Sequence, residues 1–144
     1  MRSKLRFSAV LAFGAAFFAS VHAADFAPRY QAIVDGRGQA TEAARLHELF
    51  KVDWDYTLDA FPELGTYLGV PGYDMRWTDL APAAIAERKR QVGRPLKVLA
   101  TIDRAQLSAA DQLNYDLFKR QAEEAVEGDR FPTELYQVTQ LSGM

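Results

Sequence analysis

The sequence predicts an all-α protein with three to four main helices packed antiparallel, and three observations support this prediction. Apolar residues recur four positions apart between residues 41 and 60, which places them on one face of a helix. Pro62 and Pro82 stand where the first turns of two further helices would begin. No stretch shows the alternation of apolar and polar residues that is typical of a half-buried strand.

The first 23 residues have the three parts of a cleavable secretory signal peptide. Three basic residues come first, residues 7–20 form an apolar run, and Val21-His22-Ala23 offers small residues at a cleavage site. The run has about 14 residues, which is short for a bilayer core of about 30 Å. We therefore expect cleavage after Ala23 and export to the periplasm or the extracellular space.

The composition of the exported part argues against certain classes of binding partner. The signal segment holds three of the 17 basic residues and none of the 19 acidic ones, so residues 24–144 carry 14 basic and 19 acidic residues, a net charge of −5. This charge argues against nucleic acid, and against an anionic membrane after signal cleavage, as the main partner. The chain has no cysteine, so packing alone must hold its single domain together.

The first expected elements lie between residues 24 and 69. We interpret residues 24–40 as an irregular or partly helical leader. A helix over 41–60 follows, with Thr41 as its N-cap. Its core face is predicted to consist of Leu46, Leu49, Phe50, Trp54, Leu58 and Phe61. Pro62 ends this helix and opens a short one over 62–69, whose inward residues are predicted to be Leu64, Tyr67 and Leu68.

An irregular stretch and a broken helix are expected next. Residues 73–80 show no period, and Trp77 is their predicted buried anchor. The helical pattern that starts at Pro82 carries apolar residues as far as Ile102. Because Pro95 removes a backbone donor in its middle, we expect a kink or two separate helices near Gly93.

The last predicted helix begins at a capping box formed by Ser108 and Asp111 and ends at Gly128. Its inward residues are predicted to be Leu113, Leu117 and either Phe118 or Ala122. Phe131-Pro132 begins an extended tail.

His47-Glu48 starts like the zinc motif His-Glu-x-x-His, but position 51 is a lysine where the second histidine would stand. Once His22 leaves with the signal, His47 is the one histidine of the chain. Zinc needs three protein ligands even in an open catalytic site. The sequence therefore predicts no metal site, no cofactor and no catalytic residue in this chain.

Two other groups of residues have both a structural and a functional interpretation. Asp55 and Asp59 could act as paired carboxylates, but the polar face of an amphipathic helix explains them better. Tyr67, Tyr73 and Trp77 surround a Gly/Pro loop. Aromatic residues build cores, and they also line grooves for peptides or sugars, so these three are the candidate groove-lining residues.

An ordered series of short motifs runs from residue 46 to residue 132: Leu46-His47-Glu48-Leu49-Phe50, Phe61-Pro62-Glu63-Leu64-Gly65, Arg76-Trp77-Thr78-Asp79-Leu80, Asn114-Tyr115-Asp116-Leu117-Phe118 and Arg130-Phe131-Pro132. This series resembles the N-terminal region of the bacterial family called domain of unknown function 885. The resemblance implies an exported, all-helical protein similar to zinc metallopeptidases, with its zinc motif far downstream. Ala81 departs from the family pattern, which usually has a capping serine at this position.

On this resemblance, residues 41–144 are the helical N-terminal region of a larger metallopeptidase-like protein, and the chain is inactive alone. Zinc and a peptide substrate are expected only for a full-length family member. The end at Gly143-Met144 looks like a truncated reading frame. The alternative is a stand-alone helical binding or interaction module of the cell envelope.

Overall fold

The computed structural model describes residues 25–38 and 40–132, and the regular structure within them is entirely helical. In chain order, these residues form α1 (Ala27–Val34), α2 (Glu42–Ala60), α3 (Pro62–Tyr67), α4 (Pro82–Gln91), α5 (Arg94–Leu99), the 3₁₀ helix η1 (Arg104–Gln106) and α6 (Ala109–Gly128). The all-α prediction is confirmed. The predicted signal segment, its cleavage site and the tail beyond Pro132 lie outside the described residues.

The predicted helix boundaries follow from local chemistry. The backbone N–H of Ala44 donates to Thr41 Oγ1 at 3.1 Å, so Thr41 is the N-cap of α2. Ser108 caps α6 in the same way, accepting from the N–H of Asp111 at 3.1 Å. Pro62 occupies the first turn of α3, and Pro95 occupies the first turn of α5. The expected break near Gly93 therefore divides this stretch into two helices.

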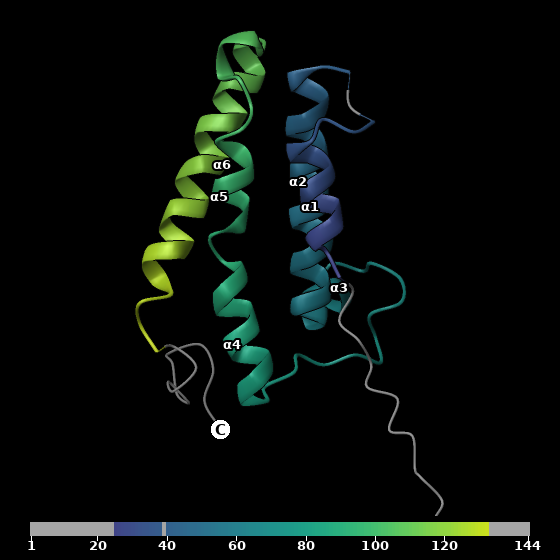
Figure 1. The fold of residues 1–144 in the computed structure, drawn as a ribbon. Helices are drawn as coiled ribbons and strands as arrows, with labels where there is room; N and C mark the ends of the chain where they lie inside the picture. The colour runs from purple at the N-terminus through teal and green to yellow at the C-terminus, as the bar shows by residue number, and fades with distance from the viewer. Residues whose placement is uncertain (1–24, 39, 133–144) are drawn as a thin grey trace, which may run out of the picture.

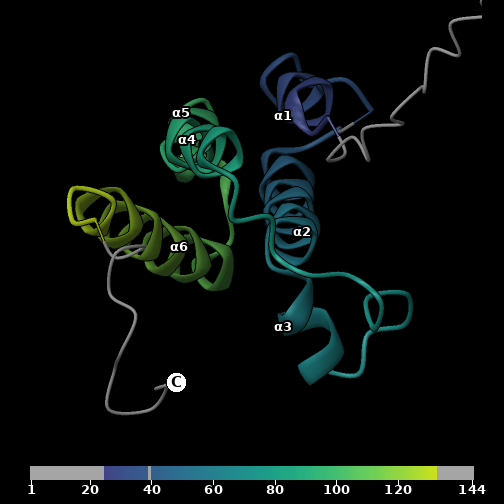
Figure 2. The same cartoon turned by 90° about the horizontal axis from the view of Figure 1, so that it is seen from below.

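The helices form an antiparallel arrangement that opens at one end. Helices α4 and α5 lie nearly end to end and run opposite to α6, while α1 lies along α2 (Figure 1). Helix α5 contacts α1, α2 and α6, and α2 also contacts α6 directly; Figure 2 shows these helices from below. None of the helices in the described part of the chain has the length and apolar character of a membrane span.

The core lies where α1, α2 and α5 meet. Helix α1 is the helical part of the predicted leader, and it contributes two buried residues, Tyr30 and Ile33. The other buried members of the core cluster are Leu46, Leu49, Val52, Val98, Leu99, Ile102 and Leu107. Helix α6 covers this core with the half-buried side chains of Tyr115 and Phe118.

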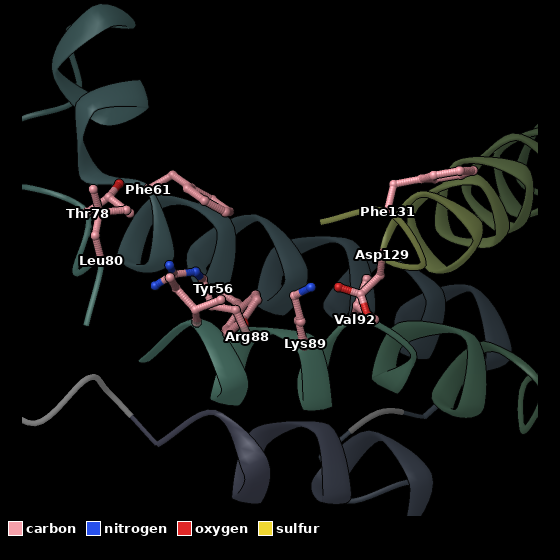
Figure 3. A pocket seen from close by; sticks show the side chains of 10 residues that line it. Tyr56, Phe61, Thr78, Leu80, Arg88, Lys89, Val92, Asp129 and Phe131 are labelled. Carbon is pink, nitrogen blue, oxygen red and sulfur yellow. The ribbon is translucent and has the colours of Figure 1, made fainter. Parts of the chain in front are cut away.

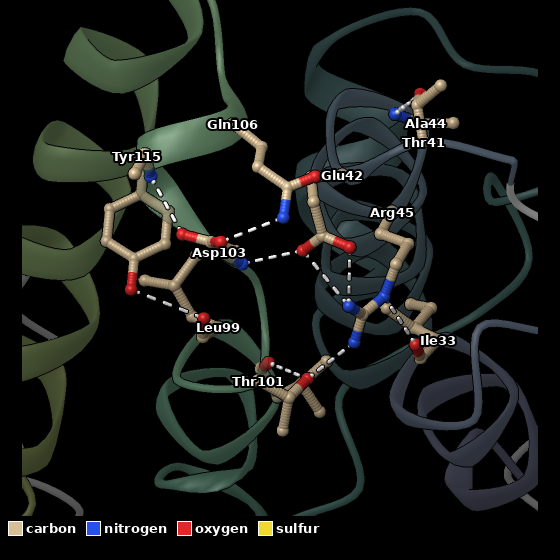
Figure 4. Close-up of polar contacts among 12 residues, drawn as sticks. Ile33, Thr41, Glu42, Ala44, Arg45, Leu99, Thr101, Asp103, Gln106 and Tyr115 are labelled. Atoms are coloured by element: carbon tan, nitrogen blue, oxygen red, sulfur yellow. Dashed lines mark hydrogen bonds and ion pairs between the residues drawn. The ribbon is translucent and has the colours of Figure 1, made fainter.

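A polar network ties α1, α2 and the end of α5 together beside the core (Figure 4). The Arg45 guanidinium donates to the carbonyl of Ile33 at 3.0 Å, to the carboxylate of Glu42 at 2.9 and 3.0 Å, and to Thr101 Oγ1 at 2.8 Å. Glu42 also accepts from the N–H of Asp103 at 2.6 Å. A single cation thus satisfies acceptors from three separate segments, which fixes how those segments sit against one another.

The predicted core face of α2 is confirmed at Leu46, Leu49 and Leu58 but wrong at two aromatic residues. Trp54 and Phe61 are nearly half exposed, whereas Val52, which was not predicted, is buried. Residues four apart turn about 40° around a helix at each step, because one turn takes about 3.6 residues. The apolar row therefore does not follow one straight line along α2, and Trp54 turns out of the core while Leu58, one turn further on, is buried again.

The predicted inward face of α6 is also partly wrong. Leu113 and Leu117 are more than half exposed, whereas Ala122 is buried and Phe118 is half-buried. The Tyr115 hydroxyl donates to the carbonyl of Leu99 at 3.3 Å, which turns the Tyr115 face toward α5. Leu113 and Leu117 lie on the opposite side of the helix, so their helical spacing was predicted correctly but their inward orientation was wrong.

Candidate functional site

An apolar cleft opens between the lower ends of the helices (Figure 3). Its main cavity measures about 400 Å³. It is built from the end of α2, the segment before α4, α4 itself and the residues after α6. The lining residues are Tyr56, Phe61, Thr78, Leu80, Ile85, Arg88, Lys89, Val92, Asp129 and Phe131. Cavities of this size are in the range that accommodates ligands or short peptide segments.

A second cavity of about 250 Å³ adjoins the first and shares Tyr56, Phe61 and Val92 with it. It extends between α2, α5 and α6, and Asp53 and Gln91 are among its polar residues. Within the described residues, the buried Oε1 atom of Gln91 has no hydrogen-bond partner. The two cavities thus adjoin along Tyr56, Phe61 and Val92, and Gln91 lines the smaller one.

Positive charge marks the rim of the main cavity. The Arg88 guanidinium lies 5.6 Å from the centre of the Phe61 ring and donates to the backbone carbonyl of Asp79 at 2.7 Å. Lys89 follows it on α4, and its side chain lies beside the cavity (Figure 3). Burial raises the pKa of Tyr56, so this hydroxyl stays neutral. Asp129 adds a carboxylate to the same lining, so the rim carries charges of both signs around an apolar cavity.

The segment between α3 and α4 is held in place by three contacts. Tyr73 packs on Gly65, where an added Cβ would lie 2.5 Å from Tyr73 Cγ. Arg76 lies over the Tyr73 ring and pairs with Asp59 at the end of α2. Glu63 accepts from the backbone N–H of Thr78 at 2.9 Å and from its hydroxyl at 2.6 Å. These contacts position Thr78 and Leu80 at the cleft.

The candidate groove-lining residues are spread over this segment. Tyr67 is 86% exposed and Trp77 is 81% exposed, so the predictions that Tyr67 faces inward and that Trp77 is a buried anchor are both wrong. Tyr73 anchors the segment instead, because only its ring has the small residue Gly65 beneath it. None of the three lines the cavities described above. Their role as groove-lining residues stays a prediction, and Phe61, Leu80 and Phe131 are cleft residues that the sequence did not reveal.

The donor set around His47 does not fit a zinc ion. Its Nε2 atom lies 2.8 Å from Asp111 Oδ1, which links α2 to the start of α6. Lys51, one turn further along α2, points its ammonium at Asp55, 3.0 Å away. The described residues contain no group of three His, Cys, Asp or Glu side chains placed to hold a metal. His47 therefore belongs to an interhelical contact.

The pKa values of two carboxylates on α2 are shifted in opposite directions. Burial raises the pKa of Asp53, against the effect of the hydrogen bond from Tyr30. For Asp55, burial acts in the same sense, but the hydrogen bonds from Arg29 at 2.7 Å and Lys51 at 3.0 Å prevail and lower its pKa. The stability contributed by Asp53 is thus lost as pH rises through its folded pKa, and that of Asp55 is lost as pH falls through its own.

We predict opposite effects of Asp53→Asn and Asp55→Asn on the free energy of unfolding at neutral pH. Asp53→Asn should raise it, because the amide oxygen can still accept from Tyr30 without the cost of a buried charge. Asp55→Asn should lower it, because Arg29 and Lys51 lose their anion. Both differences should shrink as pH falls to about 3, where free carboxyls are protonated. Urea denaturation across this range measures them, and effects of equal sign at pH 7 would contradict the assignment.

Comparison with known protein families shows which family the chain resembles. A protein-family model described as "Bacterial protein of unknown function (DUF885)" matches residues 62–144, which include α3, α4, α5 and α6. No curated protein and no solved structure matches the chain. Because the matched range covers more than half of the 144 residues, the chain belongs to the family described as bacterial protein of unknown function (DUF885).

Proposed function

We propose that this chain is the N-terminal part of an exported protein similar to helical zinc metallopeptidases, and that it is inactive alone. The observation that carries the proposal is the family match, which begins at the first residue of α3 and continues through α6. The zinc chemistry follows from the family resemblance and belongs to a downstream region. The helices described above act as framework, and the exposed rings of Tyr67 and Trp77 face the peptide substrate of the longer protein.

Export is the second part of the proposal. The basic start, the short apolar run and the small residues of Val21-His22-Ala23 support it. Intact-mass measurement of the protein recovered from the periplasm or the medium should give a chain that begins at Ala24. A recovered chain that retains Met1 would contradict signal-peptide cleavage, and the family assignment would not be affected.

We predict that the purified chain binds far less than one zinc per molecule and leaves peptides uncleaved. Lys51 occupies the position of a second histidine ligand, and the His47 ring is engaged by Asp111. Metal analysis after incubation with zinc and dialysis tests the first expectation, with His47→Ala as the matched variant. About one tightly bound zinc per chain, lost in His47→Ala, would overturn the proposal.

The DNA downstream of the stop codon separates the proposal from its alternative. A continuing frame that encodes a histidine-containing helical zinc motif supports the front part of a metallopeptidase-like protein. An unrelated gene supports a stand-alone helical interaction module. The alternative is favoured by the outer face of α6, where exposed Leu117 lines a shallow hollow with Phe50 and Phe118. An exposed apolar row of this kind is typical of helices that bind a partner.

A further inference from the structure

An open groove lies between α1 and α5 and shares no lining residue with the cleft described above. It measures about 380 Å³. Its apolar wall includes Ala27, Tyr30, Val34 and Val98, and two cations, Arg94 and Lys97, lie in the same lining. Small-molecule sites have this size and this character, because they combine a mostly apolar wall with a few polar groups that orient the ligand.

Helix α5 places both cations at the groove. The guanidinium carbon of Arg94 lies 5.8 Å from the centre of the Tyr30 ring on α1, a cation–π contact that holds this side chain against the wall. Lys97 follows Arg94 by three residues, so the two side chains share one face of α5. The Tyr30 hydroxyl is already engaged, donating to Asp53 at 3.3 Å, and its ring therefore serves as apolar wall.

Arg94 and Lys97 differ from most basic side chains of this protein. Residues 24–144 carry 14 basic and 19 acidic residues, so carboxylates are in excess. Most of the basic side chains pair with one of them. Within residues 25–38 and 40–132, neither Arg94 nor Lys97 forms an ion pair, and Lys97 has no side-chain partner of any kind. The fold therefore leaves two cations unneutralised at one groove.

Carboxylates close to the groove in sequence are engaged by other residues. Asp35, which follows α1, accepts from Arg37 at 2.5 Å and from Gln31 at 2.8 Å. Glu87 on α4 accepts from Arg90 at 3.1 Å. Neither carboxylate lines the groove, and the lining contains no Asp or Glu. In contrast to the cleft, where Asp129 joins the cations, this groove combines an apolar wall with positive charge alone.

We propose that the groove between α1 and α5 binds a small amphipathic carboxylate, such as a short fatty acid. Its carboxylate lies between Arg94 and Lys97, and its apolar chain lies along Tyr30 and Val34. The planar guanidinium offers paired N–H donors to a carboxylate, and the lysine ammonium adds a point charge. The chain covers apolar wall that is otherwise open to water, including Val34, which is 37% exposed. This inference does not depend on the proposed peptidase-like function.

Calorimetric titration of the purified chain with octanoate tests the proposal. Octanoate should saturate one site per chain, and octylamine, which has the same apolar tail and the opposite charge, should bind at least about tenfold more weakly. Acetate, which lacks the tail, should show no saturable binding. Equal affinity for octanoate and octylamine, or no binding of octanoate, would overturn the proposal. Co-sedimentation with phosphatidylglycerol vesicles without octanoate binding would also overturn it, and would assign the two cations to a membrane surface.

Lys97→Glu assigns the binding to this groove. The Lys97 side chain is exposed, so circular dichroism should show an intact fold. The variant should weaken octanoate binding at least about tenfold and strengthen that of octylamine, because the local charge is reversed. Lys97→Met, which keeps an apolar stem, should weaken octanoate binding several-fold and serves if Lys97→Glu is unfolded. Lys119→Glu makes the same charge change on α6 and should leave the affinity unchanged. Equal losses in Lys97→Glu and Lys119→Glu would contradict the assignment.

Discussion

Leu49→Ala is expected to lower the free energy of unfolding by about 2–5 kcal/mol. The Leu49 side chain is fully buried on α2, within the core cluster formed with α1 and α5. The substitution loses the transfer free energy of the leucine methyl groups. It also leaves a cavity that the three packed helices cannot easily close. A domain is typically stable by about 5–15 kcal/mol, so this loss is a large share of the total. Urea denaturation followed by circular dichroism measures it.

The matched control is Leu113→Ala, which makes the same chemical change on α6 at a side chain that is 59% exposed. Its effect is expected to stay within about 0.5 kcal/mol, as for ordinary surface substitutions. If the two variants were equally destabilised, Leu113 would be buried in solution, and the interpretation of the outer α6 face as exposed would have to be abandoned.

Gly65→Ala is expected to cost about 1–3 kcal/mol, although alanine favours a helix more than glycine does. An added Cβ would lie 2.5 Å from Tyr73 Cγ and 2.9 Å from Tyr73 Cβ, so the near end of that side chain must move. Tyr73 also carries the Arg76 guanidinium, 5.4 Å from its ring centre. Displacing the ring therefore loosens the segment that places Thr78 and Leu80 at the cleft.

Gly93→Ala is the matched control, because the nearest atom to its added Cβ is Val126 Cγ2 at 3.9 Å, an ordinary contact distance. It should be neutral or slightly stabilising. In the background of Tyr73→Ala, the added Gly65→Ala change should cost much less than in the parent chain, since the clash is gone. Strictly additive losses in that double variant would mean that the Gly65–Tyr73 contact does not hold the segment.

The predictions that succeeded rest on signals within about one helical turn. Thr41 and Ser108 cap helices because their hydroxyls accept from backbone N–H groups three residues ahead. Pro62 and Pro95 start helices because a first-turn residue needs no N–H partner. None of these depends on where the other helices lie.

The cleft could not be predicted in the same way, because its residues come from four segments that are far apart in the sequence. Phe61 and Phe131 line the same cavity only after α4 and α6 have turned back on one another. The high density of aromatic residues led to the prediction that Tyr67 and Trp77 are functional. Whether a ring is buried, however, depends on which residues pack against it in the folded chain. A small residue beneath Tyr73 decided which aromatic side chain anchors the segment.

By itself, the sequence determined that this protein is helical, where its helices begin and break, and which bacterial family it resembles. Those properties follow from backbone hydrogen bonding, proline geometry and the order of motifs along the chain. The tertiary structure decided which faces of α2 and α6 are buried, and which acceptors Arg45 joins. The spacing of apolar residues predicts an apolar stripe on a helix. Only the position of the neighbouring helices determines which residues of that stripe are buried.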